Sequence, residues 1–190
     1  MCKRLRLGVF TSCVLLLMLG IIVLPTIVGA QEMEEMGTME EISFTLTSTA
    51  FEDGQRIPSK YTCSGMDVTP PLAWSGVPEG CVSLAIIMDD PDAPNGTWVH
   101  WVIWNIDPAL GGLDESMDNE GIGAVLGKNS WGKSAYGGPC PPSGVHRYNF
   151  KIYALSDYPD INPGASKSKL KRAIKDITLA EYTLMGTYSK

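Results

Sequence analysis

Histidine and cysteine are scarce in this chain of 190 residues, which contains two histidines and five cysteines. No two cysteines have the C-x-x-C spacing, which argues against a zinc knuckle. The sequence also lacks a Gly-x-Ser-x-Gly motif, and this absence argues against an ordinary serine hydrolase. No internal repeat is present, so the chain does not have the pattern of a repeat architecture.

Basic residues are also fewer than acidic ones, 15 against 21. Three of the basic residues and none of the acidic ones lie in residues 1–30. Without that segment, the chain has twelve basic and 21 acidic residues, and its net charge is −9. A balance of this sign argues against nucleic acid as the main partner.

The first thirty residues have the pattern of a secretory signal peptide. Lys3, Arg4 and Arg6 precede an apolar run, which ends at the small residues of Val28-Gly29-Ala30. We therefore expect export, to a periplasm or to the extracellular side. An uncleaved N-terminal membrane anchor is the alternative, because residues 7–28 approach the length that spans a bilayer.

The rest of the chain divides into a short linker and one domain. Residues 31–41 contain five glutamates and no aromatic residue, which is typical of a solvated linker. Residues 42–190 are enough for a single domain with a full hydrophobic core.

Strand patterns recur throughout this domain, at 42–51, 72–74, 81–88, 98–106, 146–155 and 177–189. Residues 81–88 and 98–106 are almost continuously apolar, which predicts central strands covered on both faces. Residues 146–155 alternate, with His146, Tyr148 and Phe150 on one face.

One helix is expected at 166–176, where Leu170 and Ile174 are four residues apart. The glycine- and proline-rich residues 107–145 are not expected to form a helix or a regular strand, but their backbone can approach a ligand closely. Six to eight strands with one clear helix predict a mainly β fold, either a sandwich or a distorted barrel.

The two histidines lie near strand ends, each beside a polar turn. His100 follows the aspartates of "DDPDAP", and His146 follows the turn-rich "YGGPCPPSGV". If the two strands belong to one sheet, both imidazoles reach one rim together with Asp90 and Asp92. Strand alternation places Trp98 and Trp104 on the same face and Trp101 on the other, with Trp98 at the mouth of the site.

Such a group can serve three purposes. It can bind zinc or iron, since imidazole and carboxylate are ordinary ligands of these metals. It can perform acid–base chemistry, in which a carboxylate orients an imidazole. It can hold a small anion through histidine donors. Partly buried histidines satisfied by local carboxylates, without any ligand, are the fourth interpretation.

"DDPDAP", Trp-x-His and Gly-x-His-Arg-Tyr, in this order, resemble the signature stretches of the phosphatidylethanolamine-binding protein family, which includes Raf kinase inhibitor protein. The "YGGPCPP" form is similar to the bacterial and archaeal branch. The resemblance covers residues 42–190. It implies an antiparallel β-sandwich with a large central sheet, a smaller sheet and one or two peripheral helices.

The resemblance also implies an anion pocket at one end of the sandwich. The residues that match the family's pocket are Asp90, Asp92, Trp98, His100, Gly138, Pro139, His146 and Tyr148, with Pro94 at the rim. Arg147, on the opposite face from His146, is expected to be a structural ion-pair partner. Val99 stands where animal members have a second histidine, so the kinase contacts of the animal proteins are not transferred.

These features predict an exported, non-catalytic protein that binds phosphate or a phosphorylated head group such as phosphoethanolamine, without a cofactor or a metal. The first alternative is a secreted serine-protease inhibitor that acts through a loop such as 107–135. A metal-dependent hydrolase that uses both histidines is the second. The sequence leaves open whether the protein has a partner of the protease or kinase class, and whether it contacts a membrane through the head group.

Three cysteines follow the signal segment: Cys63, Cys81 and Cys140. In an oxidising compartment one pair can form a disulfide, and the sequence leaves all three pairings open.

Overall fold

A computed structural model describes residues 43–117 and 121–190. The predicted signal peptide (1–30) and linker (31–41) lie outside these residues. Within the described part of the chain, no helix is both long enough and apolar enough to cross a membrane.

Two antiparallel sheets form the domain, as the sequence predicts. The smaller sheet has the order β1-β2-β5 and is built from β1 (Thr45–Thr47), β2 (Leu72–Ser75) and β5 (Gly112–Leu113). The larger sheet has the order β6-β4-β3-β7-β8 and is built from β6 (Val125–Leu126), β4 (Trp98–Ile106), β3 (Ser83–Asp90), β7 (His146–Leu155) and β8 (Thr178–Tyr188). One α-helix, α1 (Lys167–Ala173), and two 3-10 turns, η1 (Ser59–Tyr61) and η2 (Pro108–Leu110), complete it.

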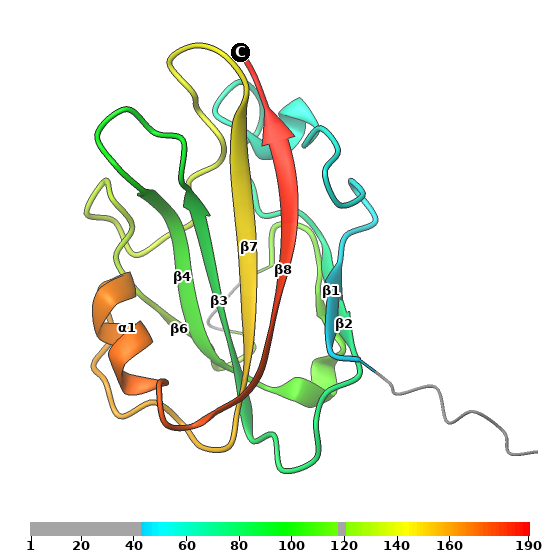
Figure 1. The fold of residues 1–190 in the computed structure, drawn as a ribbon, viewed down its shortest axis with the longest axis vertical. Coiled ribbons are helices and arrows are strands. Elements are labelled where there is room, and N and C mark those ends of the chain that lie inside the picture. Colours follow the sequence, from blue (N-terminus) through cyan, green and yellow to red (C-terminus); the bar gives the residue numbers. More distant parts are fainter. Residues whose placement is uncertain (1–42, 118–120) are drawn as a thin grey trace, which may run out of the picture. The chain divides into compact units, whose positions relative to one another are not determined.

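The large sheet is covered on both faces (Figure 1). One face packs on the small sheet, where Leu46 and Trp74 join Met88 and Phe150 in the larger apolar cluster. The other face packs on α1 through a second cluster that includes Leu170. Every residue of β3 is buried, which confirms the prediction of a central strand covered on both sides.

The predicted strand at 42–51 is wrong in length, because only Thr45–Thr47 pair with β2. Beyond Ala73 the next partner position is Leu72, followed by Pro71 and Pro70, and proline has no N–H to donate to the ladder. Residues 107–145 are also more regular than expected, since they contribute β5 and β6.

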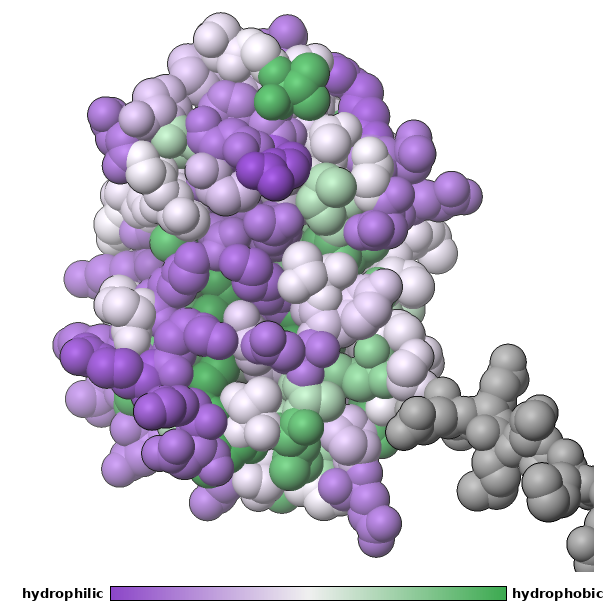
Figure 2. Space-filling view, viewed as in Figure 1, coloured by the Kyte–Doolittle hydropathy of each residue, from purple (hydrophilic) through white to green (hydrophobic). Residues whose placement is uncertain are grey.

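The predicted helix is confirmed in a shorter form. Ser166 caps the N-terminus of α1, where its hydroxyl accepts the N–H of Lys169. Leu170 and Ile174, on the inner face, are almost completely buried. Lys169, Lys171 and Arg172 of α1 are exposed, and the helix lies at the strongly hydrophilic lower left of Figure 2.

The pairing of β3 with β4 contains a β-bulge at the end nearest the histidines. Met88 pairs with Trp101 and Asp89 pairs with Val99, so β4 has one extra residue between these pairs. That residue is His100. A bulge of this kind turns two consecutive side chains toward the same face of the sheet.

The bulge changes which tryptophans share a face. Trp101 joins the cluster between the sheets, and His100 contacts Tyr148 of the same cluster. Trp104 packs on the α1 side instead. The expectation that Trp98 and Trp104 share a face is therefore wrong, because the bulge interrupts the alternation between them.

Asp89 is buried on the α1 side of the large sheet, with 1% of its side chain exposed. Lys151 donates to both of its carboxylate oxygens, at 3.1 and 3.0 Å. Lys167, at the start of α1, also binds this carboxylate. Two lysines thus compensate one buried charge and link α1 to the sheet.

We predict that Lys151→Ala and Lys167→Ala together destabilise the domain more than the sum of the two single changes. Each single variant leaves Asp89 with one cation, whereas the double variant leaves a buried carboxylate unpaired, at a cost of about 3–5 kcal/mol. Urea unfolding measures the free energies. Lys175→Ala, at an exposed position, is the control, and strictly additive losses would contradict the prediction.

Candidate ligand-binding site

A buried hydrogen-bonded pair on neighbouring strands, Asp90 and His146, begins the site. Asp90 is the last residue of β3 and His146 is the first residue of β7. His146 Nδ1 lies 2.7 Å from Asp90 Oδ2, and the two side chains are 9% and 5% exposed. Asp90 Oδ1 accepts the backbone N–H of Asp92 at 2.8 Å. Because the carboxylate accepts the Nδ1–H of His146, Nε2 is the other nitrogen with which this ring can meet a ligand.

The second imidazole is held by a backbone carbonyl. His100 Nδ1 lies 2.7 Å from the carbonyl oxygen of Gly137, which can only accept, so the proton is on Nδ1. The rings of Trp131 and Tyr148 pack edge-to-face against this imidazole at 5.1 and 5.2 Å. Burial lowers the pKa of His100 below its usual value, which favours the neutral ring with Nε2 as an acceptor.

A cavity of about 250 Å³ lies between the two histidines. Its walls come from the loop after β3, the start of β4 and the segment before β7. The lining residues are Asp90, Ala93, Pro94, Asn95, Trp98, His100, Trp131, Cys140, Pro142 and His146. Asp90, Pro94, Trp98, His100 and His146, all predicted site residues, are thus brought together.

Trp98, which lines this cavity, has a buried hydrogen-bond donor. Its indole Nε1–H has no hydrogen-bond acceptor among the described residues. A buried N–H that lacks an acceptor costs about 1–3 kcal/mol, so an acceptor group in the cavity would be stabilised there.

Asp92 is a predicted site residue that does not line the cavity. Its carboxylate accepts the side chain of Arg147 through two hydrogen bonds, Nε at 2.9 Å and a terminal nitrogen at 2.7 Å, and also the backbone N–H of Arg147. The bonded guanidinium lowers the pKa of Asp92 to about 2. Asp92 thus ties the loop after β3 to β7, and the expected ion-pair role of Arg147 is confirmed.

Tyr148, Gly138 and Pro139 lie behind the cavity wall. Tyr148 is fully buried against His100, and its hydroxyl has no hydrogen-bond partner within the described ranges. Burial and the nearby Asp90 raise the pKa of Tyr148, so its hydroxyl keeps its proton. The Gly138 N–H donates to Asp67, and the Pro139 carbonyl accepts the Cys63 N–H.

Trp131 is a lining residue that sequence reasoning did not identify. It is 45% exposed and packs edge-to-face on Trp98 at 5.3 Å as well as on His100. A lone tryptophan in the glycine-rich segment 107–145 is a signal that could have pointed to it.

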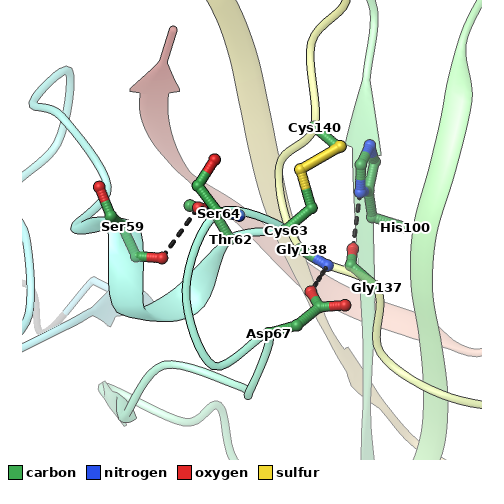
Figure 3. Close-up of a disulfide and its surroundings, with 9 residues drawn as sticks. All are labelled: Ser59, Thr62, Cys63, Ser64, Asp67, His100, Gly137, Gly138 and Cys140. Atoms are coloured by element: carbon green, nitrogen blue, oxygen red, sulfur yellow. Dashed lines mark hydrogen bonds between the residues drawn. A yellow bond between two sulfur atoms is a disulfide. The ribbon is translucent and has the colours of Figure 1, made fainter. Parts of the chain in front are cut away.

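The structure also decides the cysteine pairing. Cys63 and Cys140 form a disulfide, and Cys81 is free. Cys140 lines the cavity, so the disulfide is part of the site (Figure 3).

Residues 43–117 and 121–190 contain no group of three or more His, Cys, Asp or Glu side chains that could hold a metal ion.

Comparisons with known proteins give one consistent result. The family model described as phosphatidylethanolamine-binding protein matches residues 47–189. A UPF0098 protein of Methanothermobacter thermautotrophicus is 50% identical over 148 residues, which cover 76% of this chain and 98% of that protein. A UPF0098 protein of Aquifex aeolicus is 42% identical over 148 residues, which cover 75% and 86% of the two chains.

Solved structures agree with this similarity. A phosphatidylethanolamine-binding protein homologue of Chlamydia trachomatis, CT736, superimposes with a TM-score of 0.74 at 40% identity, over 78% of this chain and 98% of that one. E. coli YbcL, described as a new member of the mammalian family, gives a TM-score of 0.71 at 31% identity, over 77% and 98% of the two chains.

We predict that Arg147→Gln raises the pKa of Asp92 from about 2 toward the ordinary aspartate value of about 3.9, because the guanidinium is lost. A carboxyl NMR titration measures this change, and Lys175→Gln, at an exposed lysine of the helix end, should leave it unaltered. A lowered carboxyl pKa stabilises the fold above about pH 4, and that stabilisation is lost as the pH falls through about 2.

The variant should therefore be less stable than the parent at pH 5, and the difference should shrink on acidification. Since Arg147 is 58% exposed, water screens the pair and we expect the difference in stability to be small. An unchanged Asp92 pKa in Arg147→Gln would contradict the assigned cause.

Proposed function

The chain belongs to the phosphatidylethanolamine-binding protein family, and we propose that it is a non-catalytic binding protein for a small anion. The anion, phosphate or a phosphorylated head group such as phosphoethanolamine, occupies the cavity between His100 and His146. The observation that carries this proposal is the composition of the cavity wall: two imidazoles and the indole of Trp98 line it, and the Nε1–H of that indole has no hydrogen-bond partner among the described residues. Such a wall is matched by an acceptor-rich ligand.

Anion binding here depends on protons. When the rings are neutral, Nε2 of His100 and of His146 accepts hydrogen bonds and cannot donate to an anion. A proton on Nε2 turns each ring into a charged donor. His146 lies with Nδ1 on the carboxylate of Asp90. Burial lowers the pKa of His100, and the Gly137 carbonyl and the Asp90 carboxylate partly oppose that effect. The ligand and the protons should therefore bind together.

Asp90 also limits which ligands fit. A carboxylate beside an anion site repels a bare anion but attracts an ammonium group on the same ligand. This feature supports a zwitterionic head group as well as phosphate, and the two can be compared directly in solution.

Export is part of the proposal. Residues 1–30 have the signal-peptide pattern, and the Cys63–Cys140 disulfide is of the kind that persists in oxidising compartments. The intact mass of the mature protein, recovered from cell fractions, would distinguish a cleaved signal from a retained anchor.

A protease inhibitor, a metal-dependent hydrolase and a kinase-class interaction remain alternatives to test. An inhibitory loop within 107–135 would act without the cavity, so His146→Gln would leave inhibition intact. A hydrolase that uses both histidines would instead hold stoichiometric zinc or iron.

We predict that sulfate shifts the side-chain NMR signals of both histidines at one saturable site, with affinity at least about tenfold higher at pH 5.5 than at pH 7.5. Each protonated Nε2 adds a charge-assisted hydrogen bond, and a gain of about 1.4 kcal/mol is tenfold in affinity. Sulfate is chosen because its own charge is constant across this range. Phosphate and phosphoethanolamine are then titrated under the same conditions.

Two variants test the wall directly. Trp98→Phe keeps an aromatic ring but removes the Nε1–H donor, and His146→Gln removes one imidazole. Each should weaken sulfate binding about tenfold, whereas Lys175→Ala, at a distant exposed position, should not. If neither histidine signal responds to any of the three anions at either pH, the proposed function is wrong.

A further inference from the structure

A segment behind the cavity wall, residues 136–140, is bonded at each residue to another part of the chain, and its last residue, Cys140, lines the cavity. Gly137 makes two hydrogen bonds with His100 on β4. Its backbone N–H donates to the His100 carbonyl at 3.1 Å, and its own carbonyl accepts the Nδ1–H of His100. The other four residues of the segment are attached to a single loop, residues 59–67, which we name the brace loop.

Four different bonds join the brace loop to the segment. The Tyr136 hydroxyl donates to the Tyr61 carbonyl at 2.9 Å, and the Cys63 N–H donates to the Pro139 carbonyl at 3.1 Å. Asp67 Oδ1 accepts the Gly138 N–H at 2.6 Å, and a disulfide joins Cys63 to Cys140. Figure 3 shows Asp67, Gly138, Gly137 and His100 side by side, with the disulfide next to them.

The brace loop is itself well ordered by local bonds. The Thr62 hydroxyl donates to the Ser59 carbonyl at 2.8 Å and accepts the Ser64 N–H at 3.2 Å. Asp67 has a positive φ of 57°, a conformation that aspartate adopts more readily than most residues. Its own N–H donates to the Lys60 carbonyl, which fixes where its carboxylate can reach.

The contact between the two parts is too close for a side chain at Gly138. A Cβ at this position would lie 2.3 Å from the Tyr61 carbonyl oxygen and 2.8 Å from the Thr62 Cα. The backbone of the segment therefore rests directly on the backbone of the brace loop, and a shift of one is transmitted to the other.

Open space also lies against the segment. A second cavity, of about 220 Å³, is lined by Asp67, Gly137, Gly138 and the two cysteines of the disulfide. Cys140 and Trp131 line this cavity and also the cavity between the histidines. Where a segment borders a cavity it has fewer packing neighbours, so its bonds contribute more to holding it in place.

We propose that the brace loop positions His100 for ligand binding: Asp67 and the Cys63–Cys140 disulfide hold the Gly137 carbonyl where it keeps the proton of His100 on Nδ1 and presents Nε2 to the cavity. Anion affinity then depends on the redox state of the disulfide. This inference rests on the proposed anion site. The brace loop does not position His146, because the partner of that ring is Asp90, on the neighbouring strand of the large sheet.

Reduction of the disulfide is a balanced exchange with a dithiol. Dithiothreitol gives two electrons and two protons to the S–S bond, which becomes two thiols, and its own sulfurs close into a cyclic disulfide. The covalent link between Cys63 and Cys140 is then lost. Among the described residues, three hydrogen bonds still join the brace loop to the segment: Asp67 with Gly138, Cys63 with Pro139 and Tyr136 with Tyr61.

The test compares the two histidines within one molecule. Long-range proton–nitrogen NMR reports which ring nitrogen carries the proton, and sulfate titration reports affinity. The variants are Cys63→Ala with Cys140→Ala, Asp67→Ala, and Asp67→Asn, whose amide oxygen can still accept the Gly138 N–H. The controls are Cys81→Ala, which removes the free thiol, and Asp160→Ala, at an exposed aspartate before α1.

We expect Asp67→Ala and the disulfide-free variant to lose the single Nδ1–H form of neutral His100, while His146 keeps its Nδ1–H. At pH 5.5 both variants should bind sulfate about tenfold more weakly, because the protonated His100 ring loses the acceptor that aims its Nε2–H at the cavity. This loss equals about one charge-assisted hydrogen bond. Asp67→Asn should keep the His100 proton on Nδ1. Dithiothreitol should reproduce the effect in the parent protein and in Cys81→Ala.

Unchanged His100 signals in both disrupted variants would overturn the positioning role, even if sulfate still binds the parent. An equal change at His146 would also overturn it, because a general loss of structure affects both rings. If the parent fails to bind sulfate but His100 alone still responds to Asp67→Ala, the positioning role stands and only the proposed function fails.

Discussion

The buried pair of Asp90 and His146 is the interaction on which the site depends. A carboxylate in the interior must be compensated, and the chain supplies a separate cationic or donor partner for each aspartate of its "DDPD" stretch. Asp89 binds two lysines on the α1 side, Asp90 orients His146, and Asp92 binds Arg147. Three neighbouring carboxylates therefore hold different parts of the fold, and only one of them faces the ligand cavity.

The site combines two kinds of support. His146 is fixed within the large sheet, since its partner lies on the adjacent strand. His100 is brought to the same cavity by a β-bulge, and its hydrogen-bond partner comes from a loop segment tied down by a disulfide. One imidazole is thus as rigid as the sheet, whereas the other is as rigid as the loops that hold it.

Much of the fold was predictable because its signals are local. The bounds of β4 and β7 follow from apolar character and alternation, and α1 follows from its cap and the spacing of Leu170 and Ile174. Both histidines and Asp90 were assigned to one rim on their positions at strand ends. The role of Trp131 and the faces of Trp98 and Trp104 were not recovered, because the first depends on a loop path and the second on a one-residue bulge.

The sequence by itself determined the mainly β class, the family and the chemical groups available for a pocket, because these are encoded in periodicity and in short ordered motifs. Only the tertiary structure decided that Cys63 pairs with Cys140, that Asp92 turns away to Arg147, and that His100 donates to Gly137. Each of these is a contact between residues 37 to 77 positions apart. The path of the whole chain brings such residues together, and no local pattern specifies that path.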